Sequence, residues 1–285
     1  MDFYESAVGF VKEGFREVFC PTLPSREREI CDTVRIRVIR SWGFLAQASN
    51  RGIEISAGVG WIFDTIDWAR LLSNEATGSD DCFNEYMSYV YEGITKNTQR
   101  VRANLPARPV MGIDKFAFER SSCHGIDERT ISEISTREAE VHARGVESSL
   151  AFILLHELGH VVLGHTRIDP ESLSLAEKRE IEAEADTWAI KAANKSSYNI
   201  AGSMAPYFIG SIQQSTIDWE QNSDHPMGIR RLENFYRLVL VDLESNPERR
   251  QQLGDDYDEV VQDVRKHTAI ARDCLKAIES GSSCQ

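Results

Sequence analysis

Two histidines and a glutamate in the segment LLHELGHVVLGHT, residues 154–166, have the types and spacing of a metal-dependent hydrolytic site. His156 and His160 are four residues apart, so on a helix their imidazoles project from one face and can converge on one ion. Glu157 would lie near that ion without binding it, where it can accept a proton from the attacking water. The pattern predicts His156 and His160 as metal ligands and Glu157 as a catalytic residue.

A third ligand is required, because catalytic zinc sites hold three protein ligands and leave one position for water. The segment EIEAEADTWAI, residues 180–190, places Glu182 and Asp186 on one face of a predicted helix. We expect Glu182 to bind Zn²⁺ and Asp186 to accept a hydrogen bond from the far nitrogen of a ligating histidine, which fixes its tautomer. Glu180 and Glu184 project elsewhere, so we expect both to be solvated.

Other third ligands fit less well. His165 follows His160 by five residues, about 140° further round a helix, and cannot share its ion unless the helix breaks at Gly164. We therefore expect His165 to pack near the site or behind its ligands. The three-histidine metzincin pattern requires glycine and histidine where this chain has Leu163 and Thr166, which excludes that class.

The chain resembles the gluzincin peptidases, especially the branch of heat-shock membrane metalloproteases and CAAX prenyl proteases. Three motifs carry the resemblance: HELGH, Glu182-x-x-Ala185-Asp186, and Asp224-His225-Pro226 with Arg230. The resemblance covers roughly residues 43–240 and includes the segment Gly52-Ile53-Glu54-Ile55-Ser56 ahead of a helix. This chain lacks the transmembrane helices of those families, so their membrane substrates do not carry over.

This resemblance implies a zinc metalloendopeptidase in which His225 stabilises the tetrahedral oxyanion. From the residues alone His225 is equally well a helix-start residue, and Tyr207 and Tyr236 are alternative donors. In its length, its solubility and its HELGH motif, the chain also resembles the soluble bacterial phage-exclusion proteases, which cleave a host translation factor. More distantly, it resembles the repressor-cleaving regulatory metallopeptidases. That resemblance implies a protein substrate and a role in antiviral defence. A zinc-stabilised, non-catalytic binding module is the alternative, although such a module has no need of Glu157.

The composition excludes several classes of protein. The 285 residues carry 45 acidic and 32 basic side chains, a net charge of -13 that repels phosphate backbones and anionic membranes, so we expect no nucleic acid partner. The basic group Arg100, Arg102 and Arg108 is interpreted as solvated surface. No apolar run is long enough to span a membrane, and six dispersed cysteines without a CxxC pair indicate free thiols. We therefore expect a cytoplasmic protein without membrane insertion.

Periodicity predicts an α+β, mainly helical fold with a small β-hairpin or sheet. The resemblance to the gluzincin peptidases implies a zincin-like metalloprotease core, with this hairpin or sheet beside the active-site helix. Asn50-Arg51-Gly52 predicts the hairpin turn within residues 43–57, whereas residues 34–38 fit a helix or a strand equally well. Helices are expected over residues 2–19, 60–72, 85–98, 147–165 and 175–194, from 226, and over 257–278, with Ser174 and Glu177 as a capping box and 100–130 irregular. The expected domains are an N-terminal helical extension (1–40), the catalytic domain (41–245) and a helical tail packing on the core (246–285). The oligomeric state is left open.

Overall fold

The computed structural model describes residues 1–196 and 217–282. Within these ranges the chain is mainly helical with one three-stranded sheet, which confirms the predicted α+β, mainly helical class. The chain divides into two compact units. The first unit comprises Met1–Glu17 and Val34–Leu154, and the second comprises Val18–Thr33 and Leu155–Gln285. The domain limits expected at residues 40 and 245 stay predictions.

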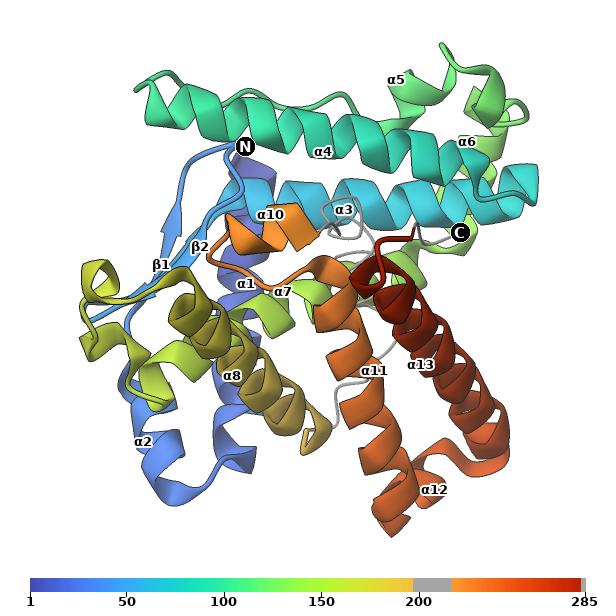
Figure 1. The fold of residues 1–285 in the computed structure, drawn as a ribbon. Coiled ribbons are helices and arrows are strands. Elements are labelled where there is room, and N and C mark those ends of the chain that lie inside the picture. The colour runs from blue at the N-terminus through green and yellow to red at the C-terminus, as the bar shows by residue number, and fades with distance from the viewer. Residues whose placement is uncertain (197–216, 283–285) are drawn as a thin grey trace. The chain divides into compact units, whose positions relative to one another are not determined.

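The sheet lies in the first unit and has the strand order β1-β3-β2 (Figure 1). Strands β2 (Ala46–Ser49) and β3 (Gly52–Ser56) form the predicted antiparallel hairpin, and β1 (Ile36–Ile39) joins β3 in parallel. Gly52 has φ +123°, and a Cβ there would lie 2.1 Å from the carbonyl oxygen of Arg35, so the turn needs glycine. The ambiguous residues 34–38 therefore belong to a strand over most of their length.

Six helices complete the first unit, and α3 and α4 run side by side (Figure 1). They are α1 (Asp2–Val18), α3 (Ala57–Leu72), α4 (Asp81–Arg102), α5 (Ile113–Ala117), α6 (Glu128–Arg137) and the N-terminal part of α7 (Ala139–Val162). The prediction of an irregular segment from 100 to 130 was wrong in part, because α5 and the start of α6 lie inside it. The Asp127 side chain caps α6 by accepting from Thr130 N, and this cap was the signal available in the sequence.

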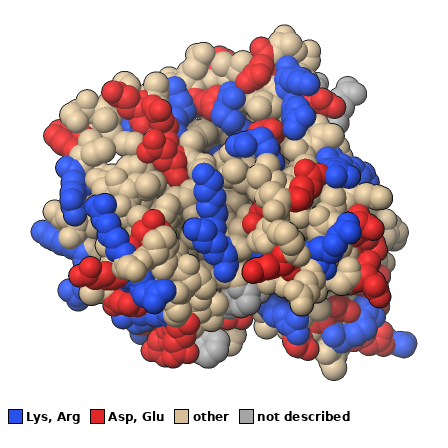
Figure 2. Space-filling view, turned by 90° about the horizontal axis from the view of Figure 1, so that it is seen from below, with Lys and Arg blue, Asp and Glu red and all other residues tan. Residues whose placement is uncertain are grey.

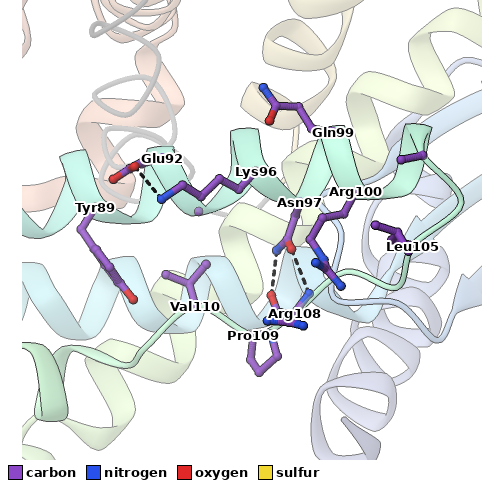
Figure 3. Close-up of a pocket in the computed structure, with 12 residues that line it drawn as sticks. Tyr89, Glu92, Lys96, Asn97, Gln99, Arg100, Leu105, Arg108, Pro109 and Val110 are labelled. Carbon is purple, nitrogen blue, oxygen red and sulfur yellow. Dashed lines mark hydrogen bonds and ion pairs between the residues drawn. The ribbon is translucent and has the colours of Figure 1, made fainter.

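The basic residues near the end of α4 line a pocket of about 520 Å³ between α4 and the returning segment 103–110 (Figure 3). Asn97 holds this segment, since its side chain donates to Arg108 O (2.7 Å) and accepts from Arg108 N (2.8 Å). Arg100 donates from Nε to Pro106 O at 2.8 Å, and Lys96 pairs with Glu92 at 2.6 Å. Arg102 is exposed as expected, whereas Arg100 also ties the returning chain to the helix.

The second unit is helical throughout its described part. It contains α2 (Ser25–Thr33), the end of α7, α8 (Leu175–Asn194), α10 (Ile217–Gln221), α11 (Gly228–Ser245), α12 (Pro247–Leu253) and α13 (Tyr257–Glu279). The predicted capping box of Ser174 and Glu177 begins α8. Helix α11 packs against both α8 and α13 (Figure 1). Six residues of α13 are buried: Val261, Val264, Thr268, Ala271, Cys274 and Ile278.

The expectation of free thiols was wrong. Cys20 pairs with Cys31 and Cys82 with Cys123, and Cys274 is also disulfide-bonded. The spacing of the cysteines in the sequence did not reveal these pairs, because tertiary contacts bring them together. The turn into α2 brings Cys31 back to Cys20, and the contact between α4 and the turn Ser121–Cys123 joins the second pair. Disulfides persist in oxidising compartments and are rare in the cytosol. The argument from free thiols for a cytoplasmic location is therefore removed.

The surface shows no grouping of one charge over the visible face, where acidic side chains lie between small groups of basic ones (Figure 2). Among the described residues, no helix combines the length and the apolar character needed to cross a bilayer.

We predict that replacing both Cys82 and Cys123 by serine lowers the free energy of unfolding in urea by about 2–5 kcal/mol, because the unfolded chain loses a cross-link. A thiol titration of the denatured, unreduced proteins provides the control. The bridge requires that parent and double variant contain equal numbers of thiols, whereas two additional thiols in the parent would contradict the pairing.

Candidate metal centre

Close packing of α8 on the end of α7 brings the predicted site residues together within the second unit. Gly159, inside the HELGH motif, makes this approach possible. A Cβ at Gly159 would lie only 3.2 Å from Ala185 O and 3.2 Å from a ring carbon of Trp188. The small residue therefore lets the backbone of α8 come close enough for Glu182 and Asp186 to reach the histidines.

His156, His160 and Glu182 converge on one point. The Nε2 atoms of the two histidines lie 3.2 Å apart, and Glu182 places Oε2 3.2 Å from His156 Nε2 and Oε1 3.5 Å from His160 Nε2. One ligand atom from each residue lies within 4.8 Å of the others, and together the three residues could hold a metal ion. The structure thus brings together the three residues expected to be ligands.

The chemistry of these atoms fits a cation. Glu182 Oε2 is buried and has no hydrogen-bond partner, although His156 Nε2 lies at 3.2 Å. His156 has its other nitrogen, Nδ1, 2.8 Å from Asp186 Oδ1, and a carboxylate there can only accept. A neutral His156 therefore donates from Nδ1 and keeps a bare lone pair on Nε2. Lone pairs that face one another in a buried site are stabilised by a positive ion between them.

The electrostatic field at the site also favours positive charge. Burial lowers the pKa of His156, but the carboxylates of Asp186 and Glu182 outweigh this effect and leave the pKa well above its usual value. Burial raises the pKa of Glu182, yet the same histidines hold that pKa far below the ordinary glutamate range. The carboxylate is ionised and the surroundings of His156 attract a cation.

Asp186 is held by Arg231 of α11 as well as by His156. Arg231 donates from Nε to Oδ2 and from Nη2 to Oδ1, both at 2.7 Å, and both side chains are buried. Burial raises the pKa of Asp186, but Arg231 and His156 outweigh it and bring the pKa to about 2. Sequence reasoning named Arg230 and missed Arg231. One residue turns a helix by about 100°, so Arg230 instead points to Glu220 and Glu279.

Glu157 is also buried, with 7% of its surface exposed. Burial raises the pKa of its carboxyl, and the neighbouring His156 and His160 oppose that shift. A carboxylate with a raised pKa holds a proton more readily than an ordinary glutamate. The environment therefore suits Glu157 to accept a proton and to return it.

His225 reaches the same cluster from the segment ahead of α11. Its Nε2 lies 3.4 Å from Glu182 Oε2, and its Nδ1 lies 2.7 Å from Asp224 Oδ1. Burial lowers the pKa of His225, whereas Asp224 and Glu182 raise it, with a net upward shift. The ring is 47% exposed, so it faces both the cluster and solvent.

Two side chains fix the segment that carries His225. Arg179 of α8 donates from Nη1 to Glu220 O (2.7 Å) and Ser223 O (2.9 Å). Glu220 accepts from Met227 N at 3.0 Å and from Arg230 Nε at 3.0 Å. Arg230 therefore helps to place His225, although it does not reach the cluster of His156, His160 and Glu182.

His165 and Glu184 lie behind His160. The Nδ1 atoms of His165 and His160 are 3.2 Å apart, and His165 Nε2 lies 3.0 Å from Glu184 Oε2. His165 thus lies behind His160, in agreement with one of the two expectations. The expectation for Glu184 was wrong in part, because its half-exposed carboxylate binds His165. Glu180 is exposed, as predicted.

The alternative oxyanion donors find no support. Tyr236 stacks on His267 of α13, with ring centroids 5.3 Å apart, and its described ring contacts are with Phe235 and His267. Tyr207 lies outside the described residues. Of the three candidate donors, His225 is the one that the described structure brings to the cluster.

The comparison with protein families identifies the class. The family model Peptidase U49 matches residues 81–249, which is more than half of the chain and includes every residue of the cluster. The chain belongs to the peptidase U49 family, and it is accordingly a protein hydrolase. Searches among curated proteins and among solved structures found no match.

We predict that Arg231→Met lowers the free energy of unfolding by about 3–5 kcal/mol, because it leaves the buried Asp186 carboxylate without its cation. The matched control is Arg230→Met, whose half-exposed ion pairs contribute about 1 kcal/mol or less. Urea unfolding monitored by circular dichroism measures both. Equal losses in the two variants would show that the Asp186–Arg231 pair has no special weight.

Proposed function

We propose that the protein is a zinc-dependent endopeptidase of the gluzincin type, with His156, His160 and Glu182 as metal ligands. The observation that carries this proposal is the convergence of two imidazole nitrogens and a buried carboxylate oxygen without a hydrogen-bond partner. Two nitrogens and one carboxylate form a ligand set typical of catalytic zinc, which keeps one position free. Bound zinc supplies Lewis acidity, which polarises the scissile carbonyl and acidifies water.

Glu157 would act as the general base and then as the general acid. It takes a proton from the attacking water while the water oxygen bonds to the scissile carbonyl carbon. It then delivers that proton to the amide nitrogen as the carbon–nitrogen bond breaks. The upward shift of the Glu157 pKa supports both roles, because the carboxyl must hold the proton between the two steps.

His225 would donate a hydrogen bond to the oxyanion that forms on the carbonyl oxygen. Asp224 orients the ring through Nδ1 and, with Glu182, favours its protonated form, which leaves an N–H on Nε2 next to the cluster. A preorganised donor of this kind contributes about 2.7–4 kcal/mol to catalysis in other peptidases. The exposure of the ring supports its contact with a substrate.

The substrate would be a folded or unfolded protein rather than a nucleic acid or membrane protein. The net charge of -13 supports this choice. A phage-exclusion role on a host protein, in a cytoplasmic setting, rests on the resemblance of the sequence. A repressor-cleaving peptidase and a zinc-stabilised binding module are the alternatives. The buried Glu157 beside the cluster favours an enzyme over the binding module, since a structural zinc site needs no base.

We predict that Glu157→Gln keeps about one zinc per chain but abolishes cleavage, because the amide cannot accept the proton from water. Zinc content is measured by atomic emission. Cleavage is measured as new protein termini in cells that express the parent or the variant. If neither protein produces new termini although both hold zinc, the binding-module alternative is correct, whereas equal new termini from both proteins would show that Glu157 is not the base.

We further predict that Glu182→Ala loses most bound zinc, whereas Glu180→Ala retains it. The two glutamates lie on the same helix two residues apart, but only Glu182 contacts the histidines. Equilibrium dialysis against zinc and a competing chelator measures the affinity. Near-normal zinc binding by the Glu182 variant would place the third ligand elsewhere.

A further inference from the structure

We propose that His165 and Glu184 are positioning residues that hold His160 in the tautomer with a bare Nε2 facing the metal. The inference rests on the proposed zinc site and concerns the side of His160 that points away from it. Asp186 performs the corresponding task for His156, but no carboxylate among the described residues contacts the Nδ1 atom of His160 directly. Another group must fix that ring.

The end of helix α7 and the turn that follows it bring His165 to this position. Helix α7 ends at Val162, Gly164 adopts φ +81°, and the turn His165–Arg167 follows. This reversal brings His165, which a continuous helix would direct away from His160, to within 3.2 Å between the two Nδ1 atoms. The His165 side chain is only 7% exposed, so its ring is enclosed beside His160.

The direction of each hydrogen bond follows from Glu184. An ionised carboxylate only accepts, so at 3.0 Å from Glu184 Oε2 the Nε2 atom of His165 carries the hydrogen. A neutral imidazole has one N–H, and His165 Nδ1 is then an acceptor. His160 must therefore donate from its own Nδ1, and its Nε2 lone pair is left toward Glu182 and His156.

The carboxylates that orient the two ligand histidines thus differ in their exposure to solvent. Asp186 is buried and tied to Arg231, so its removal also endangers the fold. Glu184 is 57% exposed, so its carboxylate can be removed with little effect on folding. The positioning of His160 can therefore be tested without unfolding the protein.

The test compares Glu184→Ala with Glu180→Ala, an exposed glutamate of the same helix. In the metal-free proteins, nitrogen-15 shifts of the His160 ring report which nitrogen carries the hydrogen. We expect His160 to be protonated on Nδ1 in the parent and in Glu180→Ala, and to be a mixture of tautomers in Glu184→Ala. Competition with a chelator should show zinc affinity weakened about tenfold or more in Glu184→Ala alone. Glu184→Gln, whose amide oxygen can still accept from His165, should restore most of that affinity.

The outcomes separate this inference from the proposed function. If the parent takes up no zinc, the metal site is wrong, while the tautomer measurement still decides the arrangement of His165 and Glu184. If the parent binds zinc and Glu184→Ala matches it in affinity and in ring shifts, the positioning role is wrong although the metal site stands. Loss of affinity without recovery in Glu184→Gln, at unchanged ring shifts, would also contradict the inference.

Discussion

The second unit depends on the interactions that the buried Asp186 carboxylate makes. A charge taken out of water is tolerated only when it is paired and fully hydrogen-bonded. Arg231 of α11 and His156 of α7 meet this requirement together, since both bind the Asp186 carboxylate. Three helices are therefore joined through one side chain, and the same bond that satisfies the charge also sets the ring of His156. Folding and the geometry of the site are not separate properties here.

The remaining groups of the site are arranged around that pair. Glu182 lies one turn before Asp186 on α8, so the position of one carboxylate determines that of the other. Arg179, on the same helix, binds the backbone that leads to His225. Helix α8 thus carries the proposed ligand Glu182, the Asp186 carboxylate that binds the proposed ligand His156, and Arg179, which holds the segment of His225. These polar contacts explain how α8 is held in place although its apolar residues are not confined to one face of the helix.

Much of this arrangement could be predicted from local patterns. Four-residue spacing gave the faces of α7 and α8, Ser174 and Glu177 gave the start of α8, and Asn50-Arg51-Gly52 gave the hairpin. What could not be predicted depends on contacts between distant segments. The parallel pairing of β1 with β3, the two described disulfides, and the approach of Arg231 rather than Arg230 each require the path of the chain in space. His165 was uncertain because its direction depends on the left-handed conformation of Gly164.

The spacer between Glu157 and His160 is usually written as two unspecified letters. In this chain packing constrains both positions. Leu158 is fully buried, and a Cβ at Gly159 would lie 3.2 Å from the Ala185 carbonyl oxygen. A search pattern that leaves both letters open therefore discards information about helix packing. In this chain, the second of these letters records how near helix α8 comes to the residues that could hold a metal.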